Sequence, residues 1–118
     1  MNIEQLREYC LSKKGAFETL PFGPDTLVFK VAEKVFLLVG LGQIDDLSFN
    51  VKCDPEYAVE LREEFEQTVI PGYHMNKKHW NTVYANRELP DQKLNELIDH
   101  SYELIVKSLP AKIREGLQ

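Results

Sequence analysis

The chain has 118 residues, a length that fits one domain with its own hydrophobic core. Its hydrophobic content of 43% and charged content of 28% exclude disordered and fibrous proteins. The formal charge of −5 argues against general attraction to nucleic acids and anionic membranes. The acids are unevenly distributed, however, because residues 54–66 contain six of them and residues 67–87 contain none.

The sequence predicts a cytoplasmic protein with no membrane anchor. No run approaches the roughly 18 apolar residues that a membrane-spanning helix needs. The N-terminal residues are polar and include acids, unlike a secretory signal peptide. Cys10 and Cys53 lack the close spacing of a metal or redox motif, and a reducing compartment favours buried, inert thiols over a disulfide. We expect a monomer.

The first half of the chain predicts one helix followed by three strands. Asn2 and Gln5 fit a capping box for a helix that Gly15 ends. Residues 20–25 contain two prolines and a glycine, which predict a turn-rich connector. Apolar residues that alternate or run continuously then predict strands at residues 26–31, 35–42 and 47–53.

The second half predicts a helix, two strands and a final helix. Asp54 suits a helix cap and Pro55 suits the first turn of the helix that follows. Strand-like segments lie at residues 68–75 and 79–85, and the last helix covers residues 88–109. This order predicts an α+β fold in which helices pack on an antiparallel sheet of about five strands, within a single domain over residues 1–118.

No residue pattern in the chain predicts catalysis, a metal centre or a cofactor. His74 and His79 are five residues apart, with no carboxylate or cysteine at ligand spacing. Cys53 precedes a helix, a position that can lower a thiol pKa, but Asp54 and Glu56 beside it oppose this effect. Common nucleophile and phosphate-loop motifs are absent. We therefore expect no enzyme activity, no bound metal and no cofactor.

The stretch PGYHMNKKHWN, residues 71–81, concentrates cationic, amide and aromatic side chains in the window that lacks acids. Its lysines could neutralise phosphates, its asparagines could hydrogen-bond to base edges, and its aromatic rings could stack on bases. The predicted nucleic-acid contacts are Asn76, Lys77, Lys78, His79 and Trp80.

Two other interpretations of this stretch stay open. In the first, Tyr73, His74 and Asn81 line a pocket for a small ligand or a protein partner. In the second, the polar side chains are architectural and satisfy backbone groups of an irregular strand. Strand alternation places Trp80 on the face opposite Val83, and we expect Trp80 to point mostly inward because tryptophan is usually buried.

Four stretches resemble the MmcQ/YjbR family of small bacterial proteins. They are PFGPDTLVFKV, KCDPEYAVELRE, PGYHMNKKHWNTV and LPDQKLNELIDHSYELIVKSLP, which begin at residues 21, 52, 71 and 89. They follow the family's order and extend over most of the chain. Two departures are small: AEK at residues 32–34 replaces a turn that commonly contains glycine, and no additional proline precedes residue 71.

The resemblance implies a compact CyaY-like fold, similar in outline to frataxin, and a winged mode of DNA binding. It supplies no catalytic residues. The family signature coincides with the segment that the side-chain chemistry selects, and Lys30 and Lys34 would belong to a second wing. The function we expect is non-enzymatic DNA binding; the alternative is an adaptor that binds a small ligand or a protein. A third hypothesis is a frataxin-like iron site on the acidic second helix.

Overall fold

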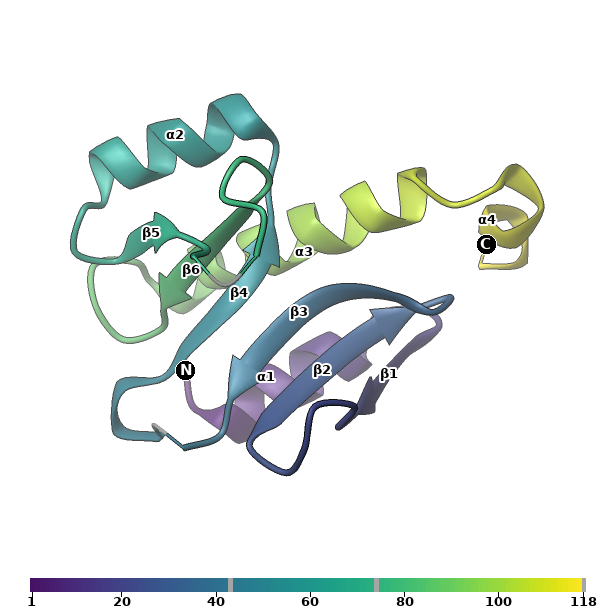
Figure 1. Cartoon of the computed structure of the whole chain (residues 1–118), viewed down its shortest axis with the longest axis horizontal. Coiled ribbons are helices and arrows are strands. Elements are labelled where there is room, and N and C mark those ends of the chain that lie inside the picture. Colours follow the sequence, from purple (N-terminus) through teal and green to yellow (C-terminus); the bar gives the residue numbers. More distant parts are fainter. Residues whose placement is uncertain (43, 74, 118) are drawn as a thin grey trace.

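The computed structural model describes residues 1–42, 44–73 and 75–117, and Figure 1 shows helices packed on an open sheet. The described strands form one antiparallel sheet of six, in the order β1-β2-β3-β4-β6-β5. The strands are β1 Ala16–Thr19, β2 Thr26–Val31, β3 Lys34–Gly40, β4 Ser48–Lys52, β5 Val69–Pro71 and β6 Trp80–Tyr84. The helices are α1 Ile3–Leu11, α2 Pro55–Glu64, α3 Asp91–Lys107 and α4 Ala111–Gly116, with a short 3₁₀ turn, η1 Ile44–Asp46.

The hydrophobic core lies between one face of the sheet and the helices α1, α2 and α3. Alternating strand residues such as Phe29, Val39, Phe49 and Val83 point to this face and are fully buried. The helices add Leu6 and Cys10 from α1, Ala58 and Leu61 from α2, and Leu94, Ile98 and Ile105 from α3. Three helices therefore cover the same face of one sheet, as the sequence predicts for an α+β fold.

A β-bulge in β3 and a serine on α3 fix the longest helix to the middle of the sheet. The register between β2 and β3 shifts at Phe29 and Lys30, so that Phe36 is the extra residue. The buried Ser101 hydroxyl donates to the Phe36 carbonyl across 2.6 Å and accepts from the Lys52 amide across 2.9 Å. This serine satisfies two backbone groups that the irregular pairing leaves free.

Local signals explain where the first two helices begin. Asn2 and Gln5 form the expected capping box of α1, with reciprocal hydrogen bonds of 2.8 and 2.9 Å. Asp54 caps α2 by accepting from the Tyr57 amide, and Pro55 occupies the first turn.

α3, at 17 residues, is the longest helix. Within the described part of the chain, no helix combines the length and apolar character needed to cross a bilayer.

The expected antiparallel α+β architecture is confirmed, but the sheet has one strand more than the expected number of about five. The first helix ends at Leu11, earlier than expected, and residues 16–19 form β1 at the edge of the sheet. Gly15 has φ +75°, and a Cβ there would lie 2.5 Å from Leu117 Cδ2. The glycine therefore reverses the chain into β1 and accommodates the C-terminal end. The helix stop expected at Gly15 is wrong, because α1 ends at Leu11 with Ser12 as its C-cap.

The turn between β2 and β3 places two residues that are not glycine in the left-handed region. Ala32 has φ 48° and Glu33 has φ 70°. A two-residue hairpin turn of type I′ requires positive φ at both positions, which asparagine and glycine adopt at lower cost. The tertiary pairing of the two strands therefore imposes this conformation on a sequence that does not favour it.

The sheet ends on two short strands. β1 has four residues and is paired on one side only, with β2. At the opposite edge, β5 has three residues, pairs with β6 and ends at Pro71, which has no amide hydrogen to donate. Both outer strands therefore present few unpaired backbone groups.

Candidate functional site

The face of the sheet opposite the helices carries mostly half-buried side chains, although Val28 of β2, the register partner of Leu38, is fully buried. Leu38, Asn50, Thr82 and Ile70 form a row across four strands, because each is the register partner of the next. All four are half-buried, whereas Val83, next to Thr82 in the chain, is fully buried on the helix face. The strand residues that alternate with the core residues in this way are called the uncovered face.

The strand residues of the uncovered face include lysines and, in the described strands, no acid. Lys30 on β2 and Lys52 on β4 both belong to this face, and Lys52 lies opposite Trp80 on β6. Glu18 is the acid of the described strands, but it lies on the helix face, where Arg7 binds it through hydrogen bonds of 2.9 and 2.5 Å. Most acids of the protein lie on the helices. The strands of the uncovered face therefore differ in charge from the helices.

A cavity of about 360 Å³ opens on the uncovered face. It is lined by Ser48, Asn50, Ile70, Thr82 and Tyr84 of the sheet and by Tyr73 of the loop between β5 and β6. The Thr82 hydroxyl donates to Asn50 Oδ1 across 2.5 Å. This bond engages the carbonyl oxygen of the Asn50 amide, so the group that Asn50 offers to the cavity is its donor, Nδ2.

A cationic side chain lies over the ring of each of the two tyrosines in this cavity. The Arg87 guanidinium lies 3.7 Å from the centroid of the Tyr84 ring. Arg87 is itself held in place, since it donates to the Gln67 carbonyl across 2.7 Å and to Asp46 across 2.9 Å. Lys77 Nζ lies 5.0 Å from the centroid of Tyr73. The cavity is therefore polar and aromatic, with a lysine at Tyr73 and the ion pair of Arg87 and Asp46 at Tyr84.

The loop between β5 and β6, of which residues 72, 73 and 75–79 are described, is held by backbone hydrogen bonds. The Gly72 amide donates to the Trp80 carbonyl across 2.9 Å, and the Trp80 amide donates to the Asn76 carbonyl across 2.9 Å. Asn76 Oδ1 accepts from the Lys78 amide across 3.0 Å. A Cβ on Gly72 would lie 3.1 Å from Trp80 Cβ, so this close crossing favours glycine.

Arg62 of α2 fixes the same loop from the helix side. Its Nε donates to Asn81 Oδ1 across 2.6 Å, and its Nη2 donates to the Lys77 carbonyl and, across 3.4 Å, to the Trp80 carbonyl. Sequence reasoning missed this role of Arg62. The available signal was a single cation within the acidic run of residues 54–66.

Asn81 does not line the cavity, and its expected ligand contact is wrong. Its side chain is 1% exposed and lies on the helix face, where Oδ1 accepts from Arg62 and Nδ2 donates to the Ala58 carbonyl across 3.5 Å. A buried amide with partners on both atoms cannot reach a ligand. For Asn81 the architectural interpretation of the stretch therefore holds.

Trp80 also differs from expectation, because it does not point into the core. It lies on the uncovered face with Thr82 and Tyr84, and it is half-buried. Val83 and Ala85 occupy the core positions instead. The pairing of β6 with β4 decides this orientation, because it aligns Val83 with Phe49 on the helix face and leaves the tryptophan on the other face.

The structure separates the two lysines of the loop. Lys77 is exposed and lies over Tyr73 at the cavity, whereas Lys78 lines a hollow of about 550 Å³ beside α2. That hollow also contains Glu56 and Glu60, so Lys78 lies on the acidic side of the molecule. This geometry therefore does not favour phosphate binding by Lys77 and Lys78 as an adjacent pair.

The remaining predicted residues lie in different places. Tyr73 is 61% exposed and lies at the cavity, as the pocket interpretation expects. His79 is half-buried, and its carbonyl accepts from the Cys53 amide across 2.7 Å. His74 lies outside the described residues. Lys34 donates to Ser108 across 3.1 Å at the C-terminal end of α3, so it does not share a surface with Lys30.

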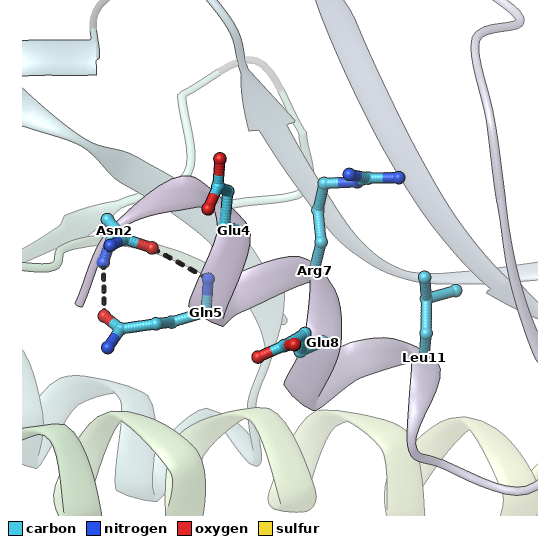
Figure 2. A pocket seen from close by; sticks show the side chains of 6 residues that line it. All are labelled: Asn2, Glu4, Gln5, Arg7, Glu8 and Leu11. Carbon is cyan, nitrogen blue, oxygen red and sulfur yellow. Dashed lines mark hydrogen bonds between the residues drawn. The ribbon is translucent and has the colours of Figure 1, made fainter.

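A third hollow, of about 530 Å³, runs along the outer surface of α1. Figure 2 shows that residues of this one helix and its cap line it: Asn2, Glu4, Gln5, Arg7, Glu8 and Leu11. Two of these, Asn2 and Gln5, are engaged with each other in the capping box, as the dashed lines in Figure 2 show. Arg7 is engaged with Glu18. Three of the six lining side chains are therefore already engaged.

The thiols and the acids offer no reactive centre among the residues described. Cys10 and Cys53 are free and buried, as expected, and burial raises the pKa of each thiol to about 12. Such thiols are almost entirely protonated and therefore unreactive at neutral pH. In the three described ranges of the chain, no three residues of the kinds His, Cys, Asp or Glu are grouped closely enough to hold a metal ion.

Known proteins are similar to this chain over most of its length, including the residues of the site. A family model described as YjbR matches residues 11–104. The Escherichia coli protein YjbR is 34% identical over 118 residues, covering 99% of this chain and 98% of its own, and Escherichia coli YbdF is 40% identical over 90 residues, covering 75% and 71%. The crystal structure of Deinococcus radiodurans DR2400, which contains a DUF419 domain, superposes with a TM-score of 0.92 at 38% identity, covering 98% of this chain and 87% of that one. None of these names states an activity.

Proposed function

The chain belongs to the MmcQ/YjbR family, and we propose that it is a DNA-binding protein without catalytic activity. The contact surface is the uncovered face together with the loop between β5 and β6. The observation that carries the proposal is the separation of charge. The strand residues of this face and the loop contain lysines and no acid, although the whole chain has a charge of −5.

Lys30, Lys52 and Lys77 are the phosphate contacts in this proposal. Lys30 and Lys52 lie on the uncovered face, and Lys77 extends the same surface from the loop. Asn76 and His79 share the loop with Lys77, and Trp80 adjoins it on β6, which supports sugar or base contacts from these residues. Lys78 contributes less, because the glutamates of α2 beside it repel phosphate.

The expected affinity is low and depends on salt. On duplex DNA, each phosphate that a cation neutralises contributes about −0.9 to the slope of log affinity against log salt concentration. Three lysine contacts therefore give a slope of about −2.7, with a dissociation constant on the order of 10⁻⁴ to 10⁻⁶ M at physiological salt. Repulsion by the acidic side places the affinity at the weak end of this range.

The test is fluorescence anisotropy of a labelled duplex titrated with protein at several salt concentrations. Lys77→Glu is expected to weaken binding and to reduce the slope by about one, because one phosphate contact is lost. Lys112→Glu on α4 is the matched control, since it makes the same change of charge at an exposed lysine outside both the sheet and the loop between β5 and β6. It should have a much smaller effect.

Two outcomes would contradict the proposal. The first is the absence of binding to duplex or single-stranded DNA at low salt. The second is an equal loss of affinity in Lys77→Glu and Lys112→Glu, which would mean that only the net charge matters. In either case the contact surface assigned above would be wrong.

A further inference from the structure

We propose that the cavity on the uncovered face is a binding site for one unpaired nucleobase, so that the preferred ligand is single-stranded nucleic acid. The inference rests on the proposed function and specifies its ligand. It starts from the fact that two tyrosines, Tyr73 and Tyr84, line the cavity. Trp80 lies on the same face, two residues before Tyr84 on β6.

The aromatic residues provide stacking surfaces that a duplex does not use. In a duplex the faces of the bases are covered by their neighbours, whereas an unpaired base can stack on a protein ring. Arg87 covers one side of the Tyr84 ring at 3.7 Å and is anchored by Gln67 and Asp46. A base that enters the cavity would stack on the other side, and the fixed arginine holds the ring in position.

The polar groups of the cavity suit the edge of a base. Asn50 Oδ1 is engaged by Thr82, so the amide presents Nδ2 as a donor. The hydroxyls of Ser48 and Thr82 lie in the same cavity and can accept a hydrogen bond. A donor beside hydroxyl acceptors matches the mixed donor and acceptor edges of nucleobases, whereas a purely apolar ligand would leave these groups unpaired.

The cations near the cavity match the backbone of a single strand. Lys77 lies over Tyr73 at one tyrosine, and Lys52 lies opposite Trp80 on the same face. A strand that places one base in the cavity can therefore bring its flanking phosphates to these lysines. The absence of acids from the strands of this face, throughout the described sheet, removes the repulsion that the helix side would exert.

The experiment compares a labelled single strand, the same strand with abasic sites in place of its bases, and a duplex, all at one low salt concentration. The single strand should bind more tightly than the other two, because only it offers unpaired bases. Tyr73→Ala and Tyr84→Ala should each weaken single-strand binding by on the order of 5- to 150-fold, the usual effect of losing one stacked base. Trp80 is the one tryptophan of the chain, so quenching of its fluorescence provides a second readout on the same face.

Three controls complete the test. Tyr84→Phe keeps the ring and should bind almost as the unaltered protein does. Phe22→Ala removes an aromatic ring that is 72% exposed in the loop between β1 and β2, and should have no effect. Thermal unfolding of each variant verifies that it folds. If Tyr84→Ala does not fold, Tyr73→Ala, at an exposed loop residue, carries the test alone.

The outcomes distinguish this inference from the proposed function. Equal binding of the single strand, the abasic strand and the duplex, all weakened by Lys77→Glu, would overturn the base site and leave DNA binding in place. Preference for the single strand with no effect of either tyrosine variant would also overturn the base site. Failure of all three nucleic acids to bind would overturn both.

Discussion

Arg62 on α2 and Asn81 on β6 are joined by a part-buried hydrogen bond of 2.6 Å between Nε and Oδ1. This bond connects the most acidic helix to the strand that carries Trp80 and Tyr84. Because Arg62 also binds two carbonyl groups of the loop between β5 and β6, it couples the position of the proposed contact surface to the packing of α2.

Replacing Arg62 should destabilise the protein. Arg62→Ala leaves the buried Asn81 amide oxygen without its donor and removes the guanidinium bond to the Lys77 carbonyl, so we expect the free energy of unfolding to fall by about 1–3 kcal/mol. Arg62→Lys should recover little of this loss, because one ammonium group cannot reproduce the geometry of the guanidinium. Urea unfolding followed by circular dichroism measures both, with Lys112→Ala as the control. An unchanged midpoint for Arg62→Ala would show that the loop is held by other contacts.

Glycine at position 33 should stabilise the protein. Glu33 has φ 70°, so Glu33→Gly relieves the cost of the left-handed conformation and should raise the free energy of unfolding by about 0.5–1 kcal/mol. The same substitution at the exposed Glu8 within α1 should lower it by about 0.5–1 kcal/mol, because glycine weakens a helix. Thermal melts of the two variants should therefore shift in opposite directions. A shift of both to lower temperature would contradict the assigned turn.

His100 should make stability depend on pH. Its Nε2 accepts from the Asp54 amide across 3.1 Å, and burial lowers the pKa of His100, against the opposing effect of the Asp54 and Glu103 carboxylates. A lowered pKa in the folded state means that the protein gains stability above about pH 6.5 and loses it as the pH falls through the folded-state pKa.

The matching variant is His100→Gln, whose amide oxygen can accept the same bond but does not titrate. Urea unfolding between about pH 7 and pH 5 should show a smaller loss of stability for His100→Gln than for the unaltered protein. Identical pH profiles would mean that the loss comes entirely from other groups.

The two thiols should react only when the protein unfolds. Burial raises the pKa of Cys10 and Cys53 to about 12, so at about pH 8 only on the order of one thiol in 10⁴ is ionised. We expect Ellman's reagent to modify the native protein slowly and to modify it rapidly in concentrated urea, with two thiols released. A rapid phase in the native protein would show that one cysteine is accessible.

The sequence was sufficient for the parts of the fold that depend on neighbouring residues. The capping box at Asn2, the cap at Asp54 and the alternation along β4 are local patterns, and each predicts its element. β1 was missed because its four residues become a strand only through pairing with β2. The same limit applies at the site, where the register between β4 and β6 decides that Trp80 lies on the uncovered face and Asn81 in the core.

Part of the site could be recognised before the structure was known. The window without acids, residues 67–87, contains Tyr73, Lys77, Tyr84 and Arg87, all of which meet at the cavity. The partners from elsewhere in the chain, Asn50 and Arg62, could not be identified from that window. Their contribution depends on strand order and on the packing of α2, which involve residues far apart in the sequence.

The short outer strands have a consequence for the protein in solution. A sheet with one bare face and long free edges would invite other chains to add strands and form fibres. Here the outer strands have four and three residues, and Pro71 closes one of them, so a second molecule has little backbone to pair with. The short outer strands therefore disfavour the addition of strands from other chains, while the broad side of the sheet stays uncovered by helices.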